Sequence, residues 1–416
     1  MNFLSLLKTA FNSLRTHKVR SALTVLGLTI GIISIILVLN LGTGLKKYVL
    51  SSLDVFGADL IEVEVKVPNT SQTSSENGMS MAQGVVITTL KISDAEAVGK
   101  HPNIRGYYYG LFGQSVVSYE TEHNTSLLWG MSAGFFDLYN AKVVEGRSFL
   151  AEEDLGQARV AVIGPKIREK FFGSGEALGR YLKIGNKKFR VVGVMEEQGT
   201  YMGMMDMDSV VYLPVRTLQK QVMGVDYIKY IMAFPKDASR SAETAADIHE
   251  IMRQQHEIID ENKEDFAVTT AAEAMQMMNT VTGGITLLLL AIAGISLVVG
   301  GVGIMNIMYV SVSERTYEIG LRKAIGATER NILWQFIWEA IFLTFTGGVA
   351  GVTLGTLLSL ISSLAAKSFG FDWGFNFSWS GVLLAVSFSV AVGLIFGVRP
   401  ARHAASLQPV EAMRME

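Results

Sequence analysis

Two kinds of feature in this chain could indicate catalysis: histidines at metal-binding spacing and glycine-rich segments that could bind phosphate. Among the six histidines, His249 and His256 form a close pair, but they read H-E-x5-H. A zinc peptidase helix needs H-E-x-x-H, because that spacing places both imidazoles on one helix face. Cysteine is absent, which excludes thiol catalysis, thiolate metal sites and disulfides. We therefore expect no metal site and no catalytic residues.

A phosphate-binding loop would be the other informative motif. The segment "GSGEALGR", residues 173–180, comes nearest to one, but it has neither the G-x4-G-K spacing nor the lysine that cradle ATP. We expect a chain that is not an enzyme and binds no cofactor itself. The net charge of −2 at pH 7 also argues against a nucleic-acid partner, because binding phosphates requires a basic surface.

The composition indicates a membrane protein with a large water-exposed part. Of 416 residues, 49% are hydrophobic and 18% charged, and the mean hydropathy is +0.32, which is too apolar for a soluble chain and too charged for one confined to the bilayer. A helix needs roughly 20 apolar residues to cross the hydrocarbon. Four stretches come close to that length or exceed it, at 21–45, 274–313, 333–366 and 381–398. They predict four membrane-spanning helices.

The flanking charges predict the orientation of these helices. Positive residues collect on the cytoplasmic side of membrane proteins, and here they precede the first span and follow the last, at Lys8, Arg15, Lys18, Arg20, Arg399, Arg402 and Arg414. We expect a multi-pass protein of the cell membrane with both termini in the cytoplasm. Residues 46–273 are then extracytoplasmic, and the segment 314–330 lies inside.

The outer residues show the patterns of a mixed domain. Runs such as "LIEVEVKV" and "KKFRVVGVM" alternate apolar and polar residues, as strands do. "SDAEAVGKH" predicts a helix with Ser93 as N-cap and Glu96 at the capping-box position. The predicted fold is an α-helical membrane protein with four transmembrane helices and a large α+β extracytoplasmic domain inserted between helices 1 and 2. The expected divisions are 1–45, 46–273 and 274–416.

A short charged segment, "SERTYEIGLRKAIGATERN" at 313–331, separates two apolar runs. Glu318 and Arg322 stand at i and i+4 with the acid N-terminal, the favourable order on a helix. Leu321 and Ile325 repeat at the same spacing on another face. The segment therefore predicts an amphipathic helix.

The boundaries of this helix are also readable. Gly326 ends the apolar pattern, and Thr328 can cap the helix that leads into the third span. On pattern alone two interpretations stay open: a connector whose arginines only enforce orientation, or a helix with a function of its own.

Several separated segments resemble one family. "SERTYEIGLRKAIGA", "FIWEAIFLTFTGGVAGVTLG" and "GVRPARHAASLQPVEAMR" resemble, in the same order, the signature segments of the MacB/FtsX-type ABC transporter permeases. "HKVRSALTVLGLTIGIISII" is similar to that family's first span. "VAVIGPKIREKFFGSGEALGRYLKIGNKKFRVVGVM" is similar to its MacB-like periplasmic core domain, which precedes the FtsX-like permease domain.

In that family, the cytoplasmic segment between spans two and three is the coupling helix, which sits in a cleft of a separate ATPase subunit. The resemblance implies that role for Glu314, Arg315, Glu318, Ile319, Gly320, Leu321, Arg322, Lys323, Ala324, Ile325 and Gly326. A helix pushed by a soluble motor needs a polar face for the motor and an apolar face for the bilayer.

Small residues repeat at four-residue spacing within three of the predicted spans. This spacing places them on single helix faces and lets helices approach closely, and it involves Gly27, Gly31, Gly347, Gly351, Gly355, Gly393 and Gly397. Glu339 is the single charge within the third span and would cost about 2.5–3.5 kcal/mol at mid-bilayer. It lies near the inner end of that span, so we expect solvation at the interface or pairing with a basic residue.

The resemblance implies a transport function. The chain would be the transmembrane permease subunit of an ABC transporter, with ATP and Mg bound by the separate ATPase, and would work as a homodimer or a closely related heterodimer. By mechanotransmission, ATPase closure would move the coupling helices, and the first two spans would carry that motion outward. The implied export cargoes are antimicrobial peptides, drugs or lipoproteins. A periplasmic adaptor or another extracytoplasmic protein is a further partner that the resemblance leaves open.

The alternative is an FtsX-like signalling subunit, whose outer domain activates an extracytoplasmic cell-wall hydrolase and exports nothing. An outer domain as long as 46–273 favours the MacB-like arrangement, because the FtsX-like one is shorter.

Overall fold

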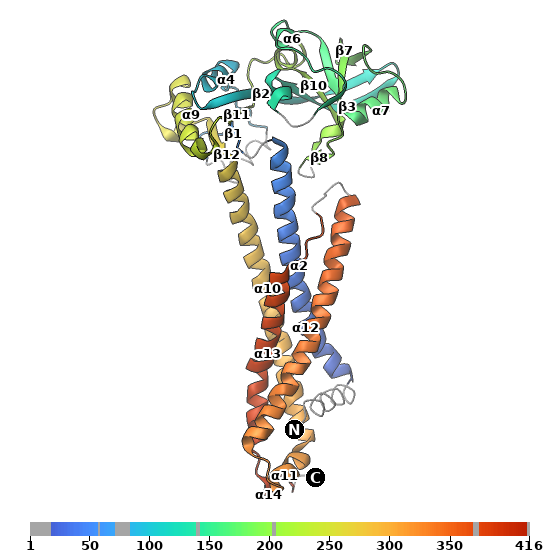
Figure 1. Ribbon diagram of the computed structural model, residues 1–416, viewed down its shortest axis with the longest axis vertical. Coiled ribbons are helices and arrows are strands. Elements are labelled where there is room, and N and C mark those ends of the chain that lie inside the picture. The colour runs from blue at the N-terminus through green and yellow to red at the C-terminus, as the bar shows by residue number, and fades with distance from the viewer. Residues whose placement is uncertain are drawn as a thin grey trace. The chain divides into compact units, whose positions relative to one another are not determined.

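The computed structural model describes residues 18–56, 59–70, 84–138, 142–201, 205–368 and 374–413 (Figure 1). The chain divides into two units, one of Met1–Tyr48 with Asn279–Glu416 and one of Val49–Met278. The first unit holds the long helices and the second holds the strands. The basic residues Lys8, Arg15 and Arg414, used above for orientation, lie outside the described residues.

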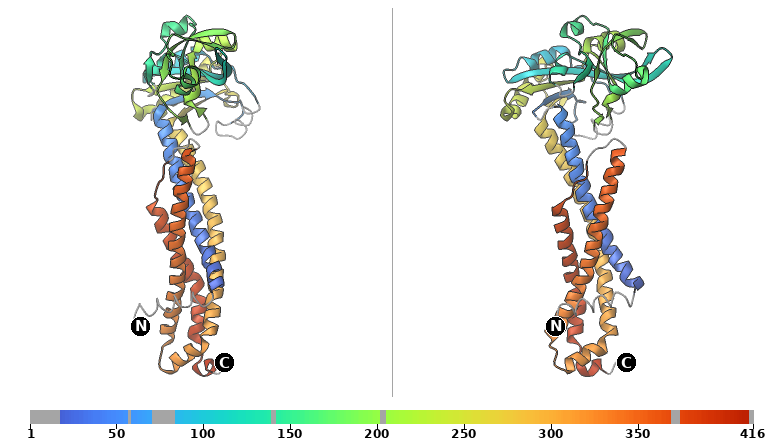
Figure 2. Two further views of the ribbon diagram at one scale, coloured as in Figure 1. Left: turned by 90° about the vertical axis from the view of Figure 1, so that its right-hand side faces the viewer. Right: turned by 45° about the vertical axis from the view of Figure 1, so that its right-hand side comes forward.

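The predicted spans are confirmed as four long apolar helices of the described chain, α2 (Lys18–Phe56), α10 (Ala271–Glu314), α12 (Glu329–Ser368) and α13 (Trp379–Ser406). They run side by side in each view (Figures 1 and 2). Each is long and apolar enough to cross a bilayer, over Leu26–Lys47 in α2 and along the full lengths of the other three. Two short helices, α11 (Thr316–Ala324) and α14 (Pro409–Ala412), follow α10 and α13.

Glycines lie where these helices meet. A β-carbon added at Gly27 of α2 would lie 3.5 Å from the Cα of Gly300 in α10, and one at Gly31 would lie 2.9 Å from Cδ2 of Leu297. The same helix meets α12 on another side, where Thr29 Oγ1 donates to the Gly347 carbonyl at 3.4 Å. Backbones therefore approach without side chains between them, as small residues allow in membranes.

The other glycines of the predicted set lie at similar contacts. Added β-carbons at Gly351 and Gly355 would lie 2.7 and 3.0 Å from the Cβ atoms of Ile32 and Ile36 in α2. In α13, those at Gly393 and Gly397 would lie 2.5 Å from Thr344 Oγ1 and from Ala340 Cβ of α12, respectively. The packed centre of the bundle is apolar and includes Leu28, Ile32, Ile36, Leu297, Phe336 and Ala340.

The second unit is an α+β domain, as predicted. Its main sheet has ten strands in the order β12-β1-β11-β2-β3-β10-β5-β7-β4, with β6 paired to β2 and β7, and β8 and β9 form a separate pair. The strands are β1 (Ile61–Val65), β2 (Ile104–Tyr119), β3 (Glu122–Met131), β4 (Val143–Gly146), β5 (Val160–Ile163), β6 (Tyr181–Ile184), β7 (Lys187–Met195), β8 (Thr200–Tyr201), β9 (Met205–Asp206), β10 (Val210–Pro214), β11 (Tyr230–Pro235) and β12 (Phe266–Thr270).

Helices cover this sheet and complete two apolar clusters. The α-helices are α4 (Ile92–Gly99), α5 (Gly134–Leu138), α6 (Ala151–Leu155), α7 (Pro165–Phe172), α8 (Val215–Thr217) and α9 (Ser241–Gln255), and a π-helix spans Leu218–Met223. One cluster joins strand residues such as Ile61 and Val63 to Val98 of α4 and Ile248 of α9. The other is half aromatic and includes Trp129, Phe135 and Tyr212.

Strand β1 joins the two ends of this domain. It is antiparallel to β11 on one side and to β12 on the other, with Val63 opposite Ile231 and Val268. The amide of Ala271, the first residue of α10, donates to the carbonyl of Leu60 at 3.0 Å. The domain therefore starts and finishes in neighbouring strands.

The cap predicted for α4 was wrong by two residues. The helix begins at Ile92 after Lys91, and Asp94 Oδ2 accepts from the Lys91 amide at 2.6 Å. Asp94 thus takes the position that we assigned to Glu96. A carboxylate in the first turn is favoured there by the helix dipole, and a second partner also holds it.

That partner is His256, which follows α9. Its Nδ1 lies 2.8 Å from Asp265 Oδ1 and its Nε2 lies 3.4 Å from Asp94 Oδ2, and 7% of its side chain is exposed. Burial alone would lower the pKa of His256, but the hydrogen bonds to Asp265 and Asp94 outweigh it and raise the pKa to about 9. The cation therefore bridges α4 to the residue before β12.

The raised pKa predicts how stability depends on pH. Because the pKa of His256 in the folded chain exceeds the ordinary histidine value of 6.5, the stabilisation from this side chain is complete below about pH 6.5 and is lost as the pH rises through about 9. We expect His256→Gln to lower stability by about 1–3 kcal/mol at pH 6 and much less at pH 10. Melting temperatures of the full chain across this range check it, with His123→Gln, which changes an exposed histidine of β3, as control. Equal losses for His256→Gln at both pH values would contradict the assignment.

Candidate functional site

The charged segment forms helix α11, and local chemistry fixes both of its ends. α10 stops at Glu314, and Thr316 Oγ1 donates to the carbonyls of Val312 and Ser313 at 3.1 and 2.9 Å. α11 ends before Gly326, whose φ of +101° suits glycine. Thr328 Oγ1 then accepts from the Asn331 amide at 3.3 Å, the predicted cap of α12.

One face of α11 is fixed to the C-terminal part of the bundle. Ile319 and Gly320 are buried, and a β-carbon added at Gly320 would lie 2.7 Å from Cβ of Ala412 in α14. Lys323 Nζ donates to the carbonyls of Ala405 and Leu407 at 2.7 and 2.8 Å. These carbonyls end α13, where a cation also complements the helix dipole. α11 is therefore attached to α13 and α14 as well as to its chain neighbours.

Ion pairs join α11 and the turn before it to α12. Arg315 Nη1 lies 3.3 Å from both carboxylate oxygens of Glu339, of which 5% is exposed. The predicted pairing of Glu339 with a basic residue is thus confirmed. Arg322 donates to Gln335 Oε1 at 2.8 Å and pairs with Glu318 one turn earlier. These bonds give α11 a defined orientation on the bundle.

The opposite face of α11 presents apolar side chains. Tyr317, Leu321 and Ile325 stand at i, i+4 and i+8 and are 58, 46 and 80% exposed. Val410 of α14 and Met413 after it are 64 and 40% exposed. α11 and α14 lie together at one end of the helical unit (Figures 1 and 2). We call these five residues the α11–α14 face.

The predicted coupling residues divide between the two sides of α11. Ile319 and Gly320 are buried, whereas the half-buried members are Arg315, Arg322 and Lys323, and the exposed ones are Glu314, Glu318, Leu321, Ala324, Ile325 and Gly326. The prediction missed Tyr317, although it continues the spacing of Leu321 and Ile325. It also missed α14, whose signal is a proline at its first position.

A catalytic pattern also occurs in the outer domain, where residues 130–134 read G-x-S-x-G between β3 and α5. Ser132 is buried, and its hydroxyl accepts from the Tyr109 amide at 3.2 Å. The two glycines have packing reasons, since added β-carbons would lie 2.8 Å from Leu218 Cδ2 and from the Tyr107 carbonyl oxygen. The serine therefore has a structural partner, whereas the nucleophile of a hydrolase needs a base.

Two family models match the chain. The MacB-like periplasmic core domain matches residues 21–251, and the FtsX-like permease C-terminal domain matches residues 290–409. The second match contains α11 and the start of α14.

Curated relatives match along almost the whole chain. The pyoverdine export ATP-binding/permease protein PvdT of Pseudomonas entomophila is 35% identical over 99% of this chain and 59% of its own length. The macrolide export ATP-binding/permease protein MacB of Bdellovibrio bacteriovorus is 33% identical over 98% of this chain and 61% of its own. The chain thus spans about 60% of the length of these relatives. Among solved structures, the periplasmic region of MacB from Actinobacillus actinomycetemcomitans is 20% identical, with a TM-score of 0.46 over 56% of this chain and 97% of its own.

Proposed function

Since the chain belongs to the family of MacB-type ABC exporter permeases, with a MacB-like core domain and an FtsX-like permease domain, we propose that it is the membrane subunit of an ATP-driven exporter. A separate ATPase subunit, which binds ATP and Mg, docks on the α11–α14 face. The observation that carries this proposal is the exposed stripe of Tyr317, Leu321 and Ile325 on a helix whose other side is fixed to the bundle.

The composition of this face suits a protein partner, so the proposal departs from the expectation that the apolar face of this helix bears on the bilayer. Large apolar side chains that stay exposed at the end of a helical unit, beside charged groups, are typical of interaction sites. The pair of Glu318 and Arg322 borders the stripe and would supply the polar rim. The names of the relatives join ATP-binding and permease functions in one protein, which supports an ATPase as the occupant.

The attachments of α11 suggest how force would pass into the membrane. α11 is bonded to α12 through Arg315 and Glu339 and to the end of α13 through Lys323. It also follows α10, a continuous helix of 44 residues that begins directly after β12. A displacement of α11 would therefore move several spans together, and α10 would carry the motion outward by mechanotransmission.

The remaining assignments follow from the same proposal. The protein is a multi-pass membrane protein with an extracytoplasmic segment, and docking of the ATPase places α11, α14 and both termini in the cytoplasm. Two copies, or this chain and a close relative, would match the two ATPase subunits of an ABC transporter. Export is favoured over hydrolase activation because the relatives are named for the export of pyoverdine and macrolides. The proposed cargo is a drug-like molecule such as those exported by the relatives, an antimicrobial peptide or a lipoprotein.

The test is ATPase binding and activity in nanodiscs that contain the full chain and its co-expressed ATPase subunit. We expect Ile325→Asp to weaken binding at least about tenfold and to abolish the effect of the permease on ATP hydrolysis, because a charge enters an apolar contact. Val410→Asp tests the contribution of α14. Both side chains are exposed, so the substitutions should leave the fold intact.

Ile259→Asp is the matched control. Its side chain is 93% exposed but belongs to the outer domain, so the same chemical change should alter neither ATPase binding nor hydrolysis. If Ile325→Asp and Ile259→Asp behave alike, α11 is a connector and the docking proposal fails.

A further inference from the structure

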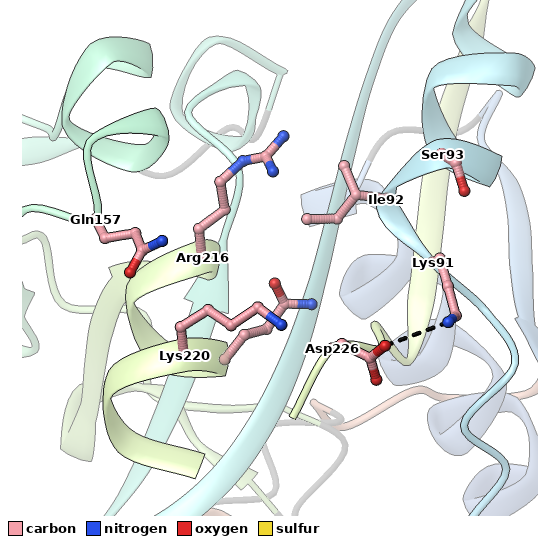
Figure 3. A pocket seen from close by; sticks show the side chains of 8 residues that line it. Lys91, Ile92, Ser93, Gln157, Arg216, Lys220 and Asp226 are labelled. Atoms are coloured by element: carbon pink, nitrogen blue, oxygen red, sulfur yellow. Dashed lines mark hydrogen bonds and ion pairs between the residues drawn. The ribbon is translucent and has the colours of Figure 1, made fainter. Parts of the chain in front are cut away.

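The outer domain contains a pocket of about 230 Å³ that the proposed function does not use (Figure 3). It lies between the start of α4 and the wound segment formed by α8 and the π-helix, and it is lined by Lys91, Ile92, Ser93, Gln157, Arg216, Gln219, Lys220 and Asp226. Pockets for drug-sized ligands occupy roughly 300–1,000 Å³. The volume here suits a smaller molecule or a single side chain.

The wall that carries Arg216 and Lys220 has an unusual backbone. Leu218–Met223 is a π-helix, which ends at Gly224 with φ of +71°. π-helical turns are rare and are frequently found at functional sites. Its buried side chains are anchored, since Gln219 Nε2 donates to the Tyr227 carbonyl at 2.7 Å. Arg216 and Lys220 are thereby held four residues apart on the pocket side of the segment (Figure 3).

Two cations at this spacing repel each other, and the carboxylates of the protein neutralise them incompletely. Arg216 Nη2 lies 3.8 Å from Glu96 Oε1 and Nε lies 3.9 Å from Asp154 Oδ2, both beyond hydrogen-bond distance. Nε is buried and has no hydrogen-bond partner among the described residues. A buried donor without an acceptor is unfavourable, and it shows that Glu96 and Asp154 leave the guanidinium incompletely paired.

The acidic side chains near Arg216 and Lys220 have other hydrogen-bond and ion-pair partners. Asp154 Oδ1 accepts from the backbone amide of Arg216 at 2.9 Å, so part of this carboxylate is already engaged by the main chain. Asp226 pairs with Lys91 at 3.2 Å on the side of the pocket that faces Arg216 and Lys220 (Figure 3). The guanidinium therefore keeps donors for an external acceptor, and its planar fork matches a carboxylate better than an ammonium does.

We propose that this pocket binds the carboxylate of a small molecule or of an acidic side chain, with Arg216 as the bidentate donor and Lys220 as the second cation. Asp226 stands on the opposite wall (Figure 3). Its carboxylate would repel a ligand with two negative charges, such as the phosphate dianion. It would tolerate a ligand that is neutral or positive at the end opposite its carboxylate. The site is independent of the ATPase face, so its test does not depend on the proposed function.

The test uses the full chain in nanodiscs and measures binding of monomethyl succinate by saturation-transfer NMR. A blocked aspartate, acetylated at nitrogen and methylated at the amide, tests the protein side chain as the source of the carboxylate. The uncharged dimethyl ester of succinate and inorganic phosphate are the comparison ligands. We expect saturable binding of at least one carboxylate at concentrations below about 10 mM, with the ester and phosphate much weaker.

Variants locate the binding. Arg216→Gln combined with Lys220→Gln should weaken carboxylate binding at least about tenfold. Arg216→Lys should retain only part of the affinity, because lysine keeps the positive charge but lacks the planar guanidinium that binds both carboxylate oxygens. The control is Arg180→Gln combined with Lys188→Gln, two exposed cations of the same domain with the same change in net charge. Lys220→Gln alone affects an exposed side chain and keeps the test informative if loss of Arg216 disturbs folding.

The outcomes separate clearly. Preference for monomethyl succinate assigns the pocket to a free carboxylate, and preference for the blocked aspartate assigns it to a side chain of a protein. Absence of saturable carboxylate binding, binding that is equal for phosphate, or equal loss in the pocket and control variants would overturn the proposal.

Discussion

Arg315→Ala should lower the free energy of unfolding by about 3–5 kcal/mol, because it removes the cation 3.3 Å from both oxygens of a buried carboxylate. The carboxylate of Glu339 then stays in surroundings that are largely closed to water, since 5% of its side chain is exposed. Loss of the attraction between these two charges in closed surroundings accounts for most of the decrease. Denaturant titration of the full chain in detergent micelles, followed through the helical signal, measures it.

The control for this prediction is Arg322→Ala. Arg322 also lies close to the end of the bundle, but its partners are Glu318, which is half exposed, and the neutral amide of Gln335. The exposed pair contributes about 0–1 kcal/mol, and loss of Arg322 leaves no buried charge behind. Glu339→Gln introduced together with Arg315→Ala should recover part of the loss, because a neutral amide needs no counter-ion. Similar losses for Arg315→Ala and Arg322→Ala, or no recovery in the double variant, would show that the buried pair is not what stabilises this end.

Gly351→Leu has the second large expected effect. A β-carbon at this position would lie 2.7 Å from Cβ and Cγ2 of Ile32 and 3.1 Å from the Thr29 carbonyl oxygen, so α2 and α12 must separate. Overpacking typically costs about 1–3 kcal/mol, and we expect the upper end because backbone atoms oppose the new side chain. The melting temperature of the purified chain should fall by several degrees.

Gly294→Leu provides the matched comparison, because a β-carbon at Gly294 of α10 meets no atom within 4 Å. Both substitutions raise helix propensity by about 1 kcal/mol, so the difference between them isolates the contact with α2. If Gly294→Leu destabilises the chain as much as Gly351→Leu does, the close approach of α2 and α12 is not what limits the substitution.

The sequence predicted the membrane part well because its signals are local. The length of an apolar run is enough to indicate whether it can span the membrane, and each of the four helices contains one of the four predicted runs. Pairing of Glu339 was also readable, since one charge within an apolar helix requires a partner. The identity of the partner could not be predicted, because Arg315 is brought close to Glu339 only by the turn that follows α10.

Other features depend on contacts between distant residues and left little trace in the pattern. The capping error at α4 arose because Ser93 and Glu96 fit the capping pattern, whereas Asp94 takes the capping-box position and is held there by His256, which follows α9. The fit of Gly320 against Ala412 requires α14 to return to α11. The π-helix is likewise absent from propensity rules. Each of these is set by tertiary packing, which single-sequence reasoning does not see.

The position of β1 constrains the order in which the molecule can be made. Both of its neighbours, β11 and β12, come from the last part of the outer domain, so β1 leaves the ribosome long before residue 230 exists. At about 5–20 residues per second, the delay is roughly ten to thirty seconds. Throughout that time a strand with Ile61, Val63 and Val65 is tethered beside a newly inserted helix with both edges open. Such strands aggregate readily, so biogenesis of this protein should depend on a holding chaperone on the far side of the membrane until β12 has been delivered and the sheet closes.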